Sequence, residues 1–304
     1  MNQTATTSRS NLLSAEFIRR LDRLDVLSRK VLRGRMQGER RSKKRGQSVE
    51  FADYRNYVVG DDLRFIDWNL YARLDKLFLR LFMEEEDLSV TLVLDTTRSM
   101  DYGDPRKLDY AKRLTAALGY ISLVKFNRLS VFAFGDSLDP SIRGLRGRRP
   151  IPQMLGFLDD LEAADGPGNL AAVTKRLALV QRQPGVVVIV SDFFDKGDLN
   201  DALRYLAQPH FDVYAIQLLS PQEIDPMKGQ LVGDLRLRDI EDGDVAEVSV
   251  TPALVKRYKA NLQAYCQHVR EQCVRRGAAY LAGDTSVPFD DMVLKYLRQR
   301  GLLG

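Results

Sequence analysis

Two strongly apolar segments that each end in a carboxylate constrain the fold of this chain more than any other feature. Residues 89–94 lead into Asp95, and residues 186–190 lead into Ser191 and Asp192. Short apolar runs of this kind are typical of buried strands in a parallel sheet. Ligands bind outside the carboxyl ends of the strands in such a sheet, so we expect Asp95 and Asp192 to meet at one site.

The rest of the chain alternates between the two kinds of segment. The patterns predict helices near 106–126, 151–161, 170–182, 198–207, 252–276 and 289–300, and further strands at 129–134, 213–218 and 278–282. Parallel strands need crossover connections, usually helices, on the faces of the sheet. The sequence therefore predicts an α/β fold with a doubly wound, mostly parallel sheet of the Rossmann-like kind, preceded by an N-terminal helical and irregular segment.

The same patterns divide the chain into three parts. Residues 1–13 are polar enough for a disordered tail. Residues 14–86 are expected to hold a helix over about 14–35, a basic linker, an irregular aromatic-rich segment over 47–75 and a strand over 76–83. The α/β domain is expected over 87–304, with a short edge element or loop at 142–149 and a β-hairpin insertion near 228–250.

Composition limits the classes of function. Hydrophobic residues make up 44% and charged residues 29%, which is enough to bury a substantial core. No apolar run approaches the roughly eighteen residues of a membrane span, and the N-terminus does not resemble a signal peptide, so we expect a cytoplasmic protein with no membrane span. Cys266 and Cys273 are too few for a disulfide framework, and His210 and His268 lie in no motif, which leaves little basis for a catalytic triad.

A basic stretch lies between residues 29 and 45, where nine lysines and arginines face a single acid, Glu39. Such a cluster can bind nucleic acid or an acidic protein surface, or can simply be a solvated linker. We favour the linker, because no aromatic residues are interleaved to stack on bases. Nucleic acid is therefore an unlikely partner.

The loop after the first carboxylate offers a set of hard oxygen ligands. Asp95, Thr97 and Ser99 place a carboxylate and two hydroxyls at alternate positions of a tight turn. Oxygen donors of this kind suit Mg²⁺ or another divalent cation. The sequence therefore predicts a metal site here, with Asp192 as a further ligand.

This loop resembles the metal-ion-dependent adhesion site of von Willebrand factor type A domains, whose first loop reads DxSxS. Thr97 replaces the first serine and keeps its hydroxyl. The resemblance implies that Thr97 and Ser99 are direct ligands, that Asp95 contacts the ion through water or orients its shell, and that Asp192 is the third-loop aspartate.

The second loop departs from that family. Its usual GGT aligns with residues 166–168, so that Gly168 stands where the family has threonine. Asn169 is the remaining candidate for a second-loop contact. The resemblance thus implies a degenerate metal-ion-dependent adhesion site.

A longer pattern lies upstream. Residues 45–73 resemble the signature RGxxxEFxxxRxYxxGDDxRxIDWxxxAR of the bacterial Domain of Unknown Function 58 (DUF58) family, which adjoins a von Willebrand type A fold. The signature positions are Arg45, Glu50, Arg55, Tyr57, Asp61, Asp62, Arg64, Asp67, Trp68 and Arg73. Members are usually encoded beside MoxR-type AAA+ ATPases. The resemblance implies such an ATPase, and other von Willebrand type A proteins, as partners.

The charges of this signature can be interpreted without the family. Arg55, Arg64 and Arg73 recur at intervals of nine among several acids, and guanidinium groups pair well with carboxylates. The network either fixes the segment as structure, which we favour, or forms a surface that recognises a partner. Trp68 fits a core position better than an exposed one.

Three functions follow, in decreasing order of preference. The first is a non-catalytic protein-interaction module that acts with a MoxR-type ATPase in protein or complex maturation. The second is nucleic-acid binding through residues 29–45. The third is a metal-dependent phosphohydrolase with Asp95 as nucleophile, which is disfavoured because Thr97 occupies the position of the second aspartate that such enzymes need as general acid. The chain has no phosphate-binding loop of the GxxxxGK(S/T) type, so ATP use would belong to a partner.

Overall fold

The chain forms two compact units. The computed structural model describes residues 12–26, 51–82, 88–135, 140–164, 168–181, 183–195, 197, 199–229, 233–238, 245–299 and 301–304. One unit comprises residues 1–36 with 88–304, and the other comprises residues 37–87. We call them the large unit and the signature unit, and describe each by itself.

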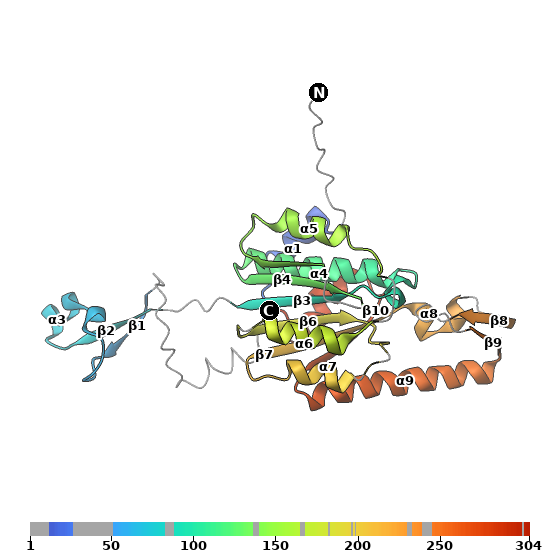
Figure 1. The fold of residues 1–304 in the computed structure, drawn as a ribbon. Coiled ribbons are helices and arrows are strands. Elements are labelled where there is room, and N and C mark those ends of the chain that lie inside the picture. Colours follow the sequence, from blue (N-terminus) through green and yellow to red (C-terminus); the bar gives the residue numbers. More distant parts are fainter. Residues whose placement is uncertain are drawn as a thin grey trace, which may run out of the picture. The chain divides into compact units, whose positions relative to one another are not determined.

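A six-stranded sheet organises the large unit, in the order β10-β7-β6-β3-β4-β5 (Figure 1). Its strands are β3 (Ser89–Asp95), β4 (Arg128–Phe134), β5 (Ser141–Leu145), β6 (Gly185–Ser191), β7 (Phe211–Leu219) and β10 (Ala279–Asp284). All neighbouring pairs are parallel except β4 with β5, which are antiparallel at the edge. The predicted doubly wound, mostly parallel sheet is confirmed.

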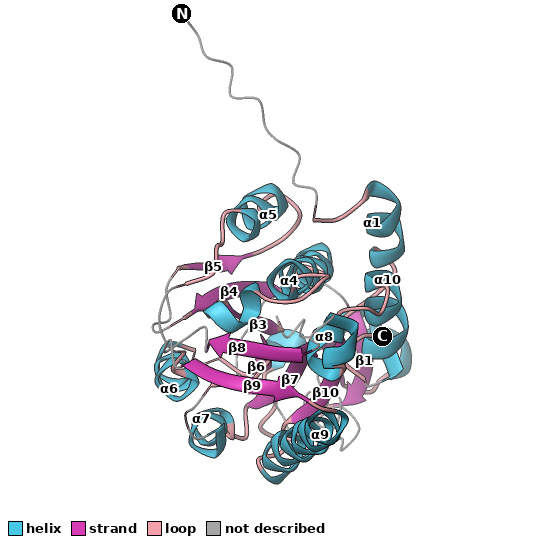
Figure 2. Ribbon diagram, turned by 90° about the vertical axis from the view of Figure 1, so that its right-hand side faces the viewer, coloured by secondary structure: helices cyan, strands magenta, loops and turns pink. Residues whose placement is uncertain are grey.

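Helices cover both faces of this sheet (Figure 2). One face carries α1 (Ala15–Leu21), α4 (Lys107–Val124), α5 (Ile151–Asp159), and α10 (Phe289–Asp291) with the π-helical turn Met292–Leu297 that continues it. The other face carries α6 (Leu170–Val180), α7 (Leu199–Leu206) and α9 (Pro252–Arg275). Because both faces are covered, every residue of β3, β6 and β7 is buried, which explains why these strands are mostly apolar and do not alternate between apolar and polar residues.

The chain winds in opposite directions from the centre of the sheet. From β3 it runs outward through α4 to β4 and β5, and from β6 it runs outward the other way through α7 to β7 and then β10. β3 and β6 are therefore neighbours at the topological switch point, where open α/β sheets bind ligands. Between β7 and α9 the chain forms α8 (Pro221–Ile224), the 3₁₀ turn η3 (Pro226–Gly229) and an antiparallel hairpin of β8 (Gly233–Arg238) and β9 (Val245–Val250).

The first helix packs within the large unit. Ser14 caps α1 by accepting a hydrogen bond from the backbone of Phe17, and the Phe17 ring lies 5.0 Å from that of Phe289. Leu12 and Leu13, which were expected in a disordered tail, are buried in the core of this unit. Their apolar side chains account for the difference. Residues 1–11 and 27–50, including the basic stretch, lie outside the described residues.

The signature unit is more regular than its sequence suggests. β1 (Phe51–Asn56) pairs antiparallel with β2 (Phe78–Phe82), and the 3₁₀ turn η1 (Leu63–Phe65) and helix α3 (Trp68–Leu74) lie between them. The expectation of an irregular segment is wrong for β1 and α3. Asp67 supplies the helix start, because its carboxylate accepts from the backbone of Asn69 and Leu70. Within the described ranges of both units, no helix is both long and apolar enough to cross a membrane.

Candidate functional site

Asp95 ends β3, and its carboxylate is held by its own loop and by β6. Its Oδ1 accepts from the backbone N–H and from the hydroxyl of Thr97 at 2.9 and 2.7 Å, and its Oδ2 accepts from Ser191 Oγ at 2.5 Å. Ser99 Oγ lies 3.0 Å from Thr97 Oγ1. Asp95 and Thr97 are buried, and Ser99 is half-buried at the rim. The structure thus joins Asp95, Thr97 and Ser99 in one chain of hydrogen bonds.

Asp192 lies at the same edge of the sheet, because β6 runs parallel to β3 beside it. Its Oδ1 accepts from the backbone N–H of Phe194 at 3.0 Å, and its Oδ2 accepts from Lys107 Nζ at 2.7 Å. Gln217 on β7 donates to its backbone carbonyl at 2.8 Å. Asp192 is therefore fixed on all sides and paired with a cation from the protein itself.

Lys107 is the first residue of α4 and is fully buried. Its ammonium also donates to Glu223 Oε1 at 2.5 Å. The other oxygen of Glu223 accepts from the backbone and hydroxyl of Ser220, which completes a capping box at the start of α8. Lys107 thus ties the end of β6 to the helix that follows β7, and Figure 1 shows α8 just beyond this edge of the sheet.

The electrostatics of the site follow from burial. Burial, and after it the negative charge of Asp192, raises the pKa of Asp95 to about 7, although the hydrogen bonds from Ser191 and Thr97 act in the other direction. Burial alone would lower the pKa of Lys107, but Asp192 and Glu223 together outweigh it, so the pKa of Lys107 is raised. Lys107 therefore carries its positive charge at neutral pH.

The described residues of the second loop, Gly168 and Asn169, place no side-chain oxygen at the site. Gly168 lies against Thr97, such that a Cβ added at Gly168 would stand 2.7 Å from Thr97 Cγ2. Asn169, the remaining candidate, caps α6 instead, since its side-chain oxygen accepts from the backbone of Ala172 at 2.9 Å. The methyl group that distinguishes Thr97 from serine fills the space that a side chain at residue 168 would need.

These residues do not fit a divalent cation as they stand. Both oxygens of Asp95 and both oxygens of Asp192 already accept hydrogen bonds from the protein. Among the described residues, no set of three or more His, Cys, Asp or Glu side chains is arranged to hold a metal. The predicted Mg²⁺ would also have to enter beside the Lys107 ammonium, a like charge in a poorly solvated place.

Several signature residues form ion pairs in the described part of the signature unit. Arg55 donates to Asp61 Oδ2 at 2.7 Å, and Arg64 donates to Asp62 Oδ2 at 2.6 Å. Asp67 is buried and accepts from Arg80 Nε at 2.8 Å and from Tyr54 Oη at 3.1 Å. The hydrogen bond from Arg80, above all other causes, lowers the pKa of Asp67. Arg45 and Glu50 lie outside the described residues.

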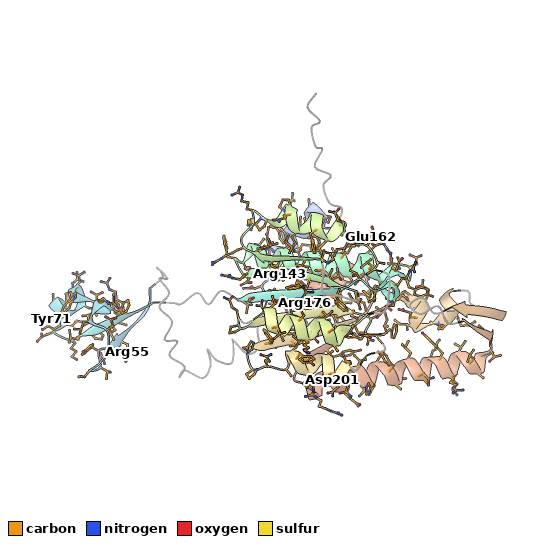
Figure 3. The ribbon with its side chains drawn as sticks, viewed as in Figure 1. Arg55, Tyr71, Arg143, Glu162, Arg176 and Asp201 are labelled. Carbon is orange, nitrogen blue, oxygen red and sulfur yellow. The ribbon has the colours of Figure 1, made fainter. Side chains whose placement is uncertain are left out.

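Trp68 is an exposed residue of this unit. Its side chain is 60% exposed on α3 and meets the Tyr71 ring edge-on, with 6.1 Å between the ring centroids. Tyr57 is half-buried and Arg73 is exposed. Arg55 projects from β1 and Tyr71 from α3, on different elements of the unit (Figure 3). The interpretation of Trp68 as a core residue is therefore wrong for the described part of this unit, where Trp68 stays largely exposed on the short helix α3.

Sequence reasoning missed the two residues that complete the buried site, Lys107 and Glu223, and the partner of Asp67, Arg80. The sequence Ser220-Pro221-Gln222-Glu223 has the form of a capping box and could have flagged Glu223. For Lys107 the available signal was a lysine that opens a helix whose other residues are mostly apolar. No local pattern marks Arg80.

The fold and the site together define a class of protein. The strand order, the antiparallel edge strand β5 and the Asp-x-Thr-x-Ser loop at the switch point are those of a von Willebrand factor type A-like α/β domain. The family model described as "Protein of unknown function DUF58" matches residues 53–281, which is most of the chain. The chain belongs to this family.

Curated relatives span nearly the whole chain. The uncharacterized proteins Rv1480 of Mycobacterium tuberculosis and Mb1516 of Mycobacterium bovis are each 28% identical over 286 residues, which cover 92% of this chain and 89% of theirs. Among solved structures, the conserved hypothetical protein BatB of Bacteroides thetaiotaomicron is similar with a TM-score of 0.44 and 15% identity, over 70% of this chain and 96% of that one. The SpRpn10 VWA domain is similar with a TM-score of 0.40 and 12% identity, over 68% and 93%.

Proposed function

We propose that this chain is a non-catalytic protein-interaction module that works with a MoxR-type AAA+ ATPase in the maturation of a protein or complex. The observation that carries the proposal is the apolar surface of the signature unit. Large apolar side chains are exposed in the loop before η1, in η1 itself and along α3: Val58, Val59, Leu63, Phe65, Trp68, Tyr71 and Leu74. Clustered exposure of this kind usually marks a surface that binds a partner.

The surface has the composition of an interface. Trp68 and Tyr71 supply aromatic anchors, and Val59 is 94% exposed in the loop before η1. The Arg64–Asp62 pair supplies a polar rim next to Leu63, because both charged side chains are in contact with solvent. Aromatic residues at the centre of a patch with polar groups at its edge are the usual arrangement of binding hot spots.

The buried site at the ends of β3 and β6, which we call the switch-point site, supports the non-catalytic part of this proposal. It consists of Asp95, Thr97, Ser99, Lys107, Asp192 and Glu223. An aspartate nucleophile must present an ionised oxygen to its substrate. Both oxygens of Asp95 are instead engaged by Thr97 and Ser191, and the Asp95 side chain is buried with a raised pKa. The partner class itself comes from the family resemblance. The basic stretch of the nucleic-acid alternative lies outside the described residues.

The test is the affinity of the purified full chain for the MoxR-type ATPase of the same cell. Trp68→Ala and Leu63→Ala are expected to weaken binding at least about tenfold each, as truncation of an interface anchor does. The matched control is Leu179→Ala, since Leu179 on α6 is 68% exposed and Leu63 is 57% exposed. Equal affinity of all three variants and the parent would contradict the proposal, as would a phosphatase activity of the parent that Asp95→Ala abolishes.

A further inference from the structure

The switch-point site contains a cation that belongs to the chain. The Lys107 ammonium lies 2.7 Å from Asp192 Oδ2, 2.5 Å from Glu223 Oε1 and 5.3 Å from the centre of the Phe194 ring. The Lys107 side chain has no exposed surface. Lysine is almost never fully buried unless it is paired, and two carboxylates and an aromatic face are favourable surroundings for an ammonium.

The acids of the site have no oxygen without a donor. Glu223 accepts from Lys107 on one oxygen and from Ser220 on the other. Asp192 accepts from Lys107 and from the backbone of Phe194, and Asp95 from Thr97 and Ser191. The buried side-chain atoms that lack a partner in the described part of the chain are Thr91 Oγ1, Thr115 Oγ1 and Gln272 Oε1, none of which belongs to these acids. The site is therefore complete with protein donors.

The packing of the second loop also disfavours a metal ion at this site. The Thr97 methyl group occupies the place where a side chain from residue 168 would enter, and its hydroxyl is fixed by Asp95 and by Ser99. A hydroxyl ligand from that loop would need Thr97 to move. Glycine at position 168 and the methyl group of Thr97 are therefore complementary in packing, because the methyl group fills the space that a side chain at position 168 would take.

We propose that Lys107 is the resident cation of this site and that the large unit needs no divalent metal there. The ammonium is the counter-charge of Asp192, the carboxylate that a metal would otherwise hold, and it also pairs with Glu223. It differs from a metal ion in two ways. It is tethered to α4, and it offers three hydrogen bonds where Mg²⁺ would require an octahedron of oxygens.

The first arm of the test uses the unaltered full chain. Its melting temperature is expected to be the same in a chelator, in millimolar Mg²⁺ and in millimolar Mn²⁺, and calorimetric titration with either ion should show no site that Asp192→Asn removes. An ion at a hundred times its Kd would instead raise the melting temperature by about 5 to 10 °C. Such a rise, abolished by Asp192→Asn, would overturn the proposal.

The second arm removes the ammonium. Lys107→Ala leaves Asp192 and Glu223 facing a vacated space, so Mn²⁺ is expected to raise the melting temperature of this variant by several degrees while leaving the parent unchanged. Lys112→Ala is the matched control, because Lys112 is also buried on α4 but donates only to the carbonyl of Asp159. If Lys107→Ala does not fold, Lys107→Gln takes its place. No response to Mn²⁺ in the folded variant would overturn the assignment of Lys107 to a cation position.

Discussion

The acids of the switch-point site and those of the signature unit are held in opposite ways. At the switch point, Asp192 and Glu223 share the single buried ammonium of Lys107, and Asp95 beside them has a raised pKa. In the described part of the signature unit, three acids each pair with a guanidinium: Asp61 with Arg55, Asp62 with Arg64 and Asp67 with Arg80. Water is excluded around Lys107, whereas both members of the Arg64–Asp62 pair are in contact with solvent.

The difference matters for energetics. Removing one member of a buried ion pair leaves the other charge with neither water nor a partner, and this strongly lowers the free energy of unfolding. Replacing the whole pair with apolar side chains costs far less. Exposed pairs are screened by solvent and contribute little when either member is lost. The same chemical interaction should therefore give large mutational effects at the edge of the sheet and small ones at the exposed Arg64–Asp62 pair of the signature unit.

The largest effect is expected from Lys107→Met. The substitution keeps the length of the side chain but strands Asp192 and Glu223, and should lower the free energy of unfolding by about 3 to 5 kcal/mol. Urea denaturation followed by far-ultraviolet circular dichroism measures it. Lys112→Met, which removes a hydrogen bond to a carbonyl and no ion pair, should cost markedly less. Equal losses in the two variants would show that the carboxylates of the site do not depend on Lys107.

The second prediction concerns pH. The pKa of Asp95 is raised from 3.8 to about 7, so the folded protein binds more protons than the unfolded chain between these values. The stability of the large unit should therefore fall as pH rises from about 4 to about 7, and change no further above that through this group. Asp95→Asn cannot ionise and should lose this decline, which denaturation curves at several pH values would show. An unchanged slope in Asp95→Asn would contradict the assignment.

Asp67 should give the opposite trend. Its pKa is lowered in the folded state, first of all by the hydrogen bond from Arg80, so its contribution is present above the ordinary pKa of aspartate and is lost as pH falls below it. Trp68 is the single tryptophan of the chain and begins α3 directly after Asp67. Its fluorescence therefore reports on the signature unit separately. This fluorescence should change at acid pH, because the signature unit loses the contribution of Asp67 to its stability there. The large unit keeps the contribution of Asp95 at the same pH.

The third prediction tests the packing between the first and second loops. Gly168→Ala places a Cβ against Thr97 Cγ2 and should cost about 1 to 3 kcal/mol, as overpacking usually does. Thr97→Ser removes that methyl group while keeping the hydroxyl that donates to Asp95. The double variant should be more stable than the sum of the two single changes implies, which a double-mutant cycle of unfolding free energies measures. Strict additivity would mean that the two residues do not compete for one space.

The smallest effect is expected from Arg64→Ala. The Arg64 side chain is 68% exposed, and its partner Asp62 is two residues away and 39% exposed. Removal of the guanidinium should leave the melting transition nearly unchanged, because water replaces it at once. Asp62→Ala is a useful comparison, since Asp62 also caps η1 through the backbone of Arg64. A large loss of stability in Arg64→Ala alone would show that the exposed pairs support the signature unit more than solvent screening allows.

Periodicity and strand-end position were enough to predict the fold and the edge at which Asp95 and Asp192 lie. Buried strands such as β3 and β6 are mostly apolar on both faces, and this is visible in the sequence without a structure. The partners of the acids were not predictable in the same way. Lys107 and Glu223 are 116 residues apart, and Asp67 pairs with Arg80 although Arg73 lies nearer to it in the sequence. Which of the possible partners forms the pair depends on which charged side chains are buried. The burial of a charged side chain cannot be recognised from a local sequence pattern.

A cation that is encoded in the chain is inherited with it. A lysine at the start of α4 and a hydroxyl ligand for a metal ion in the second loop would serve the same site in two different ways, so the two should rarely occur together in one sequence. Among relatives, those that carry the lysine of position 107 should also carry an acid at position 223, and those that regain a threonine at position 168 should have lost the lysine and returned to serine at position 97. A family alignment sorted on position 107 would then separate two groups of sequences. One group would need a metal ion at this site, and the other would supply the positive charge through its own lysine.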